Sequence, residues 1–398
     1  MGAMTVEWYD AGLRLAASAH DRLVSRMQGR PFGNVSDPIA VRAVRVDGTV
    51  RADVATRGQR GRTVHGDAGV LCALGAAGAS ITRQRCTLVT DDAVTLAVLA
   101  DVAARHPANG RYGDVAAHVA WWSDRADFPG TSAVVNVVDA CRLRWMPPDV
   151  PEGDHSAAVW RRWLSVGDAS VAGLLALLDR LVASGGPLGY LDRIAEDDQH
   201  VWDELRGAYP AGIGIGGHES IARSAVALQA RCDAAEMWQA ALLADPLWRR
   251  RAVHTGDVVE GIAVHTADAN TIEVACRRGD ARLRADSRVW VGAGDVRTEQ
   301  VQLGAGTVLG SDMVAGVLRL RVHVVRRDST VADGGPVTLT PVMLANLNAL
   351  ATNRKRLTRL YANHGWLPAG FTPTPHRRDV PLDVVVAAAD PDDEDSEV

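Results

Sequence analysis

Arginines alternate with aliphatic residues along Val317–Val324. If this segment is a strand, its aliphatic side chains face one side, and Arg319, Arg321 and His323 face the other. Guanidinium groups bind phosphates, and an aromatic ring nearby can stack on a base. The pattern predicts contact with a nucleic-acid strand. The alternative is a solvated outer face, which any half-exposed antiparallel sheet has.

The same residue types occur just before this strand. Arg282, Arg284 and Arg288 lie close together, and Trp290 follows. If Ala281–Arg284 and Ser287–Val291 form the two preceding strands, these side chains join the same barrel surface.

Three further cations belong to a predicted helix. Thr340-Pro341 provides an N-cap and a first-turn proline for a helix that ends at Asn363. Helical periodicity groups Lys355, Arg356 and Arg359 on one side. Such a side suits contact with phosphates, although an ordinary surface helix has the same pattern.

Lys355 is the only lysine in the chain, because the other 42 of its 43 basic residues are arginines. P-loop ATPases, protein kinases and Schiff-base enzymes each need a lysine at a defined place. Lys355 lies in the run Asn353–Arg356, which matches none of these contexts. The sequence therefore excludes these classes and predicts no cofactor.

An alternative chemistry uses acidic residues and a histidine of the N-terminal region. Asp114 and His118 are four residues apart on a predicted helix, and Asp91-Asp92 follow a short predicted strand. Carboxylates and imidazole are common metal ligands. The alternative is a metal-dependent hydrolase or nuclease that uses these four residues.

The first 146 residues are predicted to form a mixed α/β domain. Helical periodicity covers Thr5–Met27 and, in a valine-rich stretch that also suits a strand, Ser132–Trp145. A hairpin is predicted around Asp47-Gly48, a dipeptide favoured in type I′ turns.

A helical domain is predicted over residues 152–248, after a proline-rich linker at 147–151. Asp245-Pro246 is interpreted as its end. Its predicted helices are Ala157–Leu164, Ala169–Ala183, Asp192–Leu205 and Ser220–Leu243.

From His254 onward the hydrophobic period changes to that of strands, which predicts a small β-barrel over 253–340. A basic helix over 341–366 and a tail over 367–398 follow, and the tail is predicted to be acidic and disordered from 390. The fold class is α+β multidomain. The predicted strands are Asp257–Val264, Thr271–Cys276, Ala281–Arg284, Ser287–Val291, Gly306–Leu309, Val317–Val324 and Pro336–Leu339.

Turn glycines and alternating valines give this region a family resemblance. The runs Gly256–Gly261, Thr271–Val274, Arg282–Arg284 and Val289–Gly292 resemble the small OB- or SH3-like barrels of nucleic-acid helicases and their accessory factors. The resemblance covers about residues 253–340 only. It implies nucleic-acid binding, and the missing phosphate-binding lysine motif implies an accessory subunit rather than a motor.

Charge is distributed unevenly along the chain. The net charge is −5, yet residues 247–389 hold 19 basic and 13 acidic residues, and the tail 390–398 holds six acidic ones. A basic region favours nucleic acid, and an acidic tail can compete for it.

Composition predicts a cytoplasmic protein. The chain has no apolar run long enough to span a membrane, and its five scattered cysteines fit reduced thiols. The excess of arginine over lysine is typical of GC-rich, actinobacterial coding.

The sequence thus predicts a non-motor nucleic-acid-binding accessory subunit of a DNA- or RNA-processing or defence-type complex, with a protein partner. The metal-dependent enzyme and a purely structural assembly subunit are the alternatives.

Overall fold

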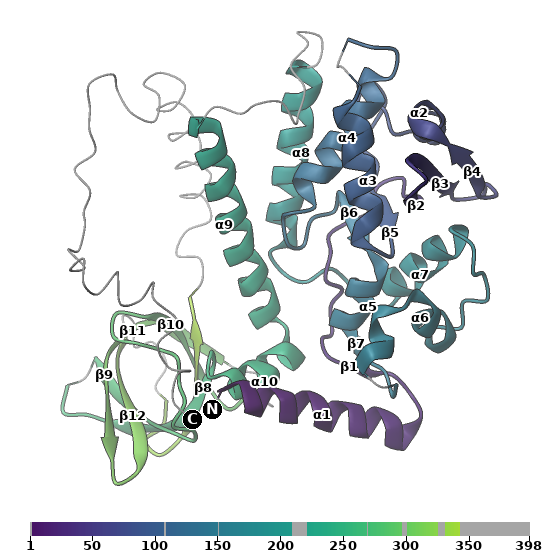
Figure 1. The fold of residues 1–398 in the computed structure, drawn as a ribbon. Coiled ribbons are helices and arrows are strands. Elements are labelled where there is room, and N and C mark those ends of the chain that lie inside the picture. The colour runs from purple at the N-terminus through teal and green to yellow at the C-terminus, as the bar shows by residue number, and fades with distance from the viewer. Residues whose placement is uncertain are drawn as a thin grey trace, which may run out of the picture.

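The computed structural model describes residues 2–106, 109–149, 151–208, 221–268, 270–296, 301–324 and 331–342 (Figure 1). They form a mixed α/β part, helices around it, and a β-barrel that meets the helices at α10. No described helix combines the length and the apolar character needed to cross a bilayer.

A five-stranded sheet in the order β4-β3-β2-β5-β6 organises the α/β part. The first three strands form an antiparallel meander, and β5 and β6 then run parallel to β2. Asp47 and Gly48 have φ values of 47° and 76°, so the predicted hairpin turn is confirmed. The strands are β2 (Ile39–Val46), β3 (Thr49–Thr56), β4 (Arg62–His65), β5 (Leu88–Thr90) and β6 (Val134–Asn136).

Helices pack on both faces of this sheet because its central strands are apolar on both sides. Ile39 and Val41 contribute to one core with α2 (Gly66–Ala77), α3 (Ala93–Ala104) and α4 (Gly113–Arg125). Ala40 faces the other core.

The second core contains residues from both sides of the segment 147–151. Val89 and Val138 share it with Leu174 and Leu178. Its helices are α5 (Val137–Arg144), α6 (Ala157–Trp163) and α7 (Ala172–Ala183), and the 3₁₀ turn η1 (Pro151–His155) lies between α5 and α6. Part of the predicted helical domain therefore packs on the N-terminal sheet.

Two N-terminal predictions need correction. The first helix, α1, spans Gly2–His20 and ends before Met27, because Asp21 adopts φ 46°. The stretch Ser132–Trp145 is β6 and then α5, because Asn136 caps a helix by accepting from the Val138 and Asp139 amides. β7 (Trp145–Met146) follows and pairs with β1 (Val24–Ser25).

Asp245-Pro246 begins a helix instead of ending the helical region. The Asp245 carboxylate accepts hydrogen bonds from the Leu247 and Trp248 amides (2.9 and 3.2 Å), and Pro246 fills the first turn. This helix, α10 (Pro246–Thr255), follows α8 (Leu191–Ala208) and α9 (Ile221–Ala244).

Two buried carboxylates join distant segments. Asp198 of α8 accepts from Arg125 of α4, from the Thr131 hydroxyl, and from the amide and hydroxyl of Ser132. Asp245 accepts from the Gln28 and Gly29 amides (2.6 and 3.0 Å) in addition to its own helix.

A third carboxylate fastens α1 to α10. Asp10 forms ion pairs with Arg26 and Arg251, each at 3.2 Å. Both guanidinium groups also lie over the Trp248 ring. Figure 1 shows α1 running along α10, next to the barrel.

Six strands close into an antiparallel barrel in the order β10-β11-β12-β9-β8-β13. Its interior is aliphatic, with Val274, Val289, Val308, Leu320 and Val337 fully or almost fully buried. The strands are β8 (Val259–His265), β9 (Thr271–Cys276), β10 (Arg288–Ala293), β11 (Val301–Val314), β12 (Val317–Val324) and β13 (Pro336–Pro341).

Ala281–Arg284 is not a strand. The Arg282 amide donates to the carbonyl of Gly256, and the Arg284 amide donates to the Ser287 hydroxyl. These bonds hold the segment against the end of α10. Leu283 is buried in the core, and Ala281 packs against it. The alternating pattern therefore marks an irregular connection.

Thr340 and Pro341 are the last residues of β13, where they pair with Trp290 and Val289. The rest of the predicted basic helix and the tail lie outside the described residues, as do Lys355, Arg356 and Arg359.

The five cysteines are free thiols. Cys86, Cys141 and Cys276 are buried, whereas Cys72 and Cys232 are exposed. Burial raises the pKa of Cys86 and of Cys276 to about 11, so these two thiols stay protonated.

Replacing Asp245 with Ala is expected to destabilise the protein by about 2–4 kcal/mol, because four backbone amides lose their acceptor. Chemical denaturation measures the change. Asp179→Ala is the control: Asp179 makes an exposed ion pair with Arg57, which is worth less than about 1 kcal/mol. Equal losses in both variants would contradict the role of Asp245.

Candidate nucleic-acid interface

The outer surface of the barrel carries the predicted contact residues on β12. Leu320, Val322 and Val324 point into the core, and Arg319, Arg321 and His323 alternate with them. The predicted division of this strand into two faces is confirmed.

Strand register connects β12 with β10 across β11. Thr307 of β11 lies opposite both Arg288 of β10 and His323 of β12, so these three side chains form one row. Trp290 follows Arg288 on the same side of β10. We call Arg288, Trp290, Thr307, Arg321 and His323 the β10–β12 face.

Trp290 is exposed on this face, with 38% of its surface accessible. Its partners across the neighbouring strands are Ala305 and Thr340, both small. The indole therefore has no large neighbour in its own row.

Arg321 reaches over a glycine of β11. It lies opposite Gly310, and a β-carbon built there would be 3.6 Å from the Arg321 Nη2 atom. The guanidinium therefore extends from β12 over β11, and it lies 3.6 Å from Asp312 of that strand.

Several of the predicted arginines have acidic partners. Arg319 forms an ion pair with Glu273, and Arg282 forms one with Asp257. Arg284 and Arg288 are exposed and form no ion pair with another described residue. Arg282 and Arg284 precede β10 and lie on no barrel strand, so the structure groups only part of the predicted set.

The barrel is not basic as a whole. Its described residues between Gly256 and Val342 include seven arginines and nine acidic residues. The surplus over 247–389 comes from Arg249–Arg251 of α10 and from Arg354–Arg359, which is outside the described residues. Any binding by the barrel would depend on the local β10–β12 face.

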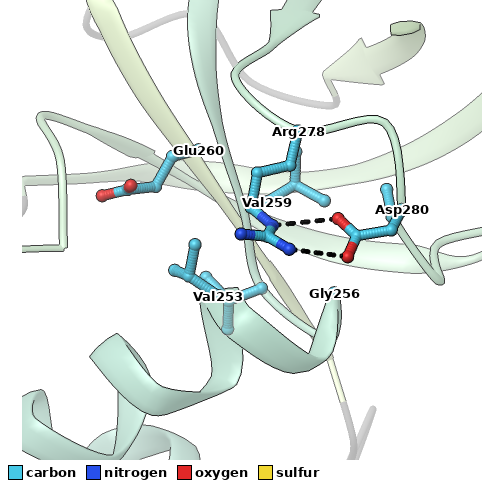
Figure 2. Close-up of a pocket in the computed structure, with 8 residues that line it drawn as sticks. Val253, Gly256, Val259, Glu260, Arg278 and Asp280 are labelled. Carbon is cyan, nitrogen blue, oxygen red and sulfur yellow. Dashed lines mark hydrogen bonds and ion pairs between the residues drawn. The ribbon is translucent and has the colours of Figure 1, made fainter. Parts of the chain in front are cut away.

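A crevice lies where α10 joins the barrel (Figure 2). Val253 and Gly256 border it from the helix side, with Val259 of β8 opposite. Arg278 and Asp280 form a two-bond ion pair in its wall, at 2.9 and 2.8 Å. Since both charges are already paired, the crevice is best described as a joint between helix and barrel.

The four residues of the alternative metal site do not come together. Asp92 caps α3 through the Thr95 amide at 2.6 Å, and Asp114 accepts from the Ser80 hydroxyl. Asp91 forms a two-bond ion pair with Arg42. No group of three metal-ligating side chains occurs in the part of the chain that the structure describes.

Arg42 occupies the place where parallel sheets commonly bind ligands. The strand order reverses between β2 and β5, and such a switch point opens beyond the carboxyl ends of the strands. Arg42 fills it by pairing with Asp91 at 2.6–3.0 Å and by donating to the Ala169 carbonyl. No signal in the sequence pointed to this pair.

His118 is buried among three tryptophans. Its ring centroid is 4.6 Å from those of Trp122 and Trp202 and 5.6 Å from that of Trp121. Neither ring nitrogen has a hydrogen bond of normal geometry in the described structure, although carbonyls of Ser80 and Cys86 partly offset the burial. Burial lowers the pKa of His118 to about 3.

Comparison of the chain with protein-family models, with curated proteins and with solved structures gave no match.

Acid is expected to destabilise the protein through His118. Its pKa is about 3 when folded and about 6.5 when unfolded, so the unfolded chain binds the proton first as the pH falls. The contribution of neutral His118 is complete above pH ~6.5 and is lost towards pH ~3, on the order of 2 kcal/mol by pH 5.

Unfolding free energies of a His118→Phe variant should fall less between pH 7 and 5 than those of the parent protein. His200→Gln is the control, because His200 is exposed and pairs only with Glu204. Parallel pH profiles for the parent and His118→Phe would refute this assignment.

Proposed function

We propose that this chain is a non-motor nucleic-acid-binding accessory subunit of a DNA- or RNA-processing or defence-type complex. It binds a single strand on the β10–β12 face. The observation that carries the proposal is the exposed Trp290 beside Arg288. Arg288 forms no ion pair with another described residue, and it lies in one row with Thr307 and His323.

The dimensions of this face support a single strand as the ligand. Adjacent strands are about 4.8 Å apart, so the Arg288–Thr307–His323 row spans roughly 10 Å across the barrel. Neither the row itself nor the Trp290 row next to it contains a carboxylate among the described residues. Trp290 would stack on a base, and Arg288 and Arg321 would bind phosphates.

The closed barrel is also compatible with the resemblance to small barrels of helicases and their accessory factors. Because the chain lacks a phosphate-binding lysine motif, the motor would belong to a protein partner. Trp8 and Leu15, exposed two helical turns apart on α1, support such a contact.

Acidic neighbours of the arginines limit the electrostatic contribution to nucleic-acid binding. Glu273 and Asp312 lie beside Arg319 and Arg321, so stacking would provide much of the binding energy. Mutation can therefore separate the contribution of aromatic stacking to binding from the contribution of ionic contacts.

Trp290→Ala is expected to weaken binding of labelled oligothymidine and oligouridine by about 1–3 kcal/mol without changing the salt dependence, because it removes stacking only. Arg288→Ala should lower the slope of log K against log salt by roughly 0.7, the value for one phosphate contact on a single strand. Fluorescence anisotropy over a salt series measures both.

Arg277→Ala is the matched control, because Arg277 follows β9 on the opposite side of the barrel and lies near Glu260. It should leave affinity and slope unchanged. Absence of binding by the parent protein at about 50 mM salt would overturn the proposal and favour a structural assembly subunit.

A further inference from the structure

The hairpin between β11 and β12 ends in an exposed apolar tip. Met313, Val314 and Val317 have 62%, 44% and 40% of their surface accessible, and Leu309 in the adjacent bulge has 52%. We call Met313–Leu318 the hairpin tip.

The tip extends beyond the wall of the barrel. β12 pairs with β9 only from Arg319 to His323, whereas β11 and β12 continue to pair through Met313–Leu318 and Val314–Val317. Among the described residues, no third strand pairs with β12 at the register of these last two pairs. A turn in such a position normally carries polar residues.

The turn residues are an unusual choice for their geometry. Ala315 and Gly316 adopt φ 50° and 79°, a two-residue type I′ turn that favours Asn or Asp at its first position. The chain uses Asp47-Gly48 for the same turn between β2 and β3. At position 315 the chain has an alanine instead. Its positive φ is unfavourable for alanine, but the side chain keeps the tip apolar.

The tip is continuous with the β10–β12 face. Outward positions along β12 run from His323 through Arg321 and Arg319 to Val317, about 20 Å at the rise of a strand. A strand bound along this line would meet the tip at one end. Aliphatic side chains in that place can wedge between base pairs and unstack them.

We propose that the hairpin tip is a wedge that inserts at the junction between duplex and single-stranded nucleic acid. This inference rests on the proposed single-strand binding and specifies its substrate as a forked duplex. The β10–β12 face holds the single strand. Val314 and Val317, on the same outward side of the hairpin, stack against the last base pair, and Met313 borders them from the other side of the hairpin.

A forked DNA duplex with 2-aminopurine at the junction tests the wedge, and a single strand of the same sequence tests the face. The parent protein should bind the fork about tenfold more tightly than the single strand and raise 2-aminopurine fluorescence. The triple variant Met313→Gln, Val314→Thr, Val317→Thr should lose the fork preference and the fluorescence rise while keeping single-strand affinity.

Ala315→Asn provides a variant that should fold at least as well as the parent, because asparagine adopts positive φ more readily than alanine. It should still weaken fork binding. Asp47→Asn, at the matching turn of the other hairpin, should change neither quantity.

The possible outcomes separate the two proposals. If the parent protein binds neither the fork nor the single strand, the proposed function is overturned. Single-strand binding without fork preference, or a preference that tip variants retain, overturns the wedge alone. Tip-dependent binding to phosphatidylcholine vesicles, or tip-dependent self-association in sedimentation without fluorescence change, also overturns it.

Discussion

Buried carboxylates are the constraint on which the arrangement of this molecule depends. A charge removed from water is stable only where several donors surround it. Asp198 meets this demand with Arg125, Thr131 and Ser132, and Asp245 meets it with four backbone amides. Each carboxylate takes donors from a segment far from it in sequence, residues 125–132 for Asp198 and residues 28–29 for Asp245, so few arrangements of the helices satisfy both.

The same requirement positions the barrel. Asp245 starts α10, Asp10 binds the middle of α10 through Arg251, and the left-handed Gly256 ends the helix where β8 approaches. The Gly256 carbonyl then accepts from the Arg282 amide, and the Arg278–Asp280 pair lies beside this joint. A continuous series of polar contacts thus leads from the N-terminal helix to the barrel wall, while the β10–β12 face and the hairpin tip remain exposed.

Local patterns in the sequence predicted much of the fold, and contacts between distant segments account for the errors. β9 and β12 were predicted to the residue because alternation is strict there. Ala281–Arg284 alternates equally well, but its amides bond to Gly256 and Ser287, which the pattern cannot reveal. Regional charge was misleading for the barrel, because Glu273 and Asp312 lie on strands beside the arginines they neutralise. Arg42 was overlooked since its partner, Asp91, is 49 residues away.

The pairing of α1 with α10 also has a consequence for the order of events during synthesis. Asp10 and Arg251 are separated by 241 residues, and Gln28 and Asp245 by 217. On the ribosome, α1 emerges long before α10 is synthesised, and the sheet and its helices can form in the interval. Truncated chains that end before residue 245 therefore keep the Arg14–Asp154 ion pair of α1 but lack all of its contacts with α10.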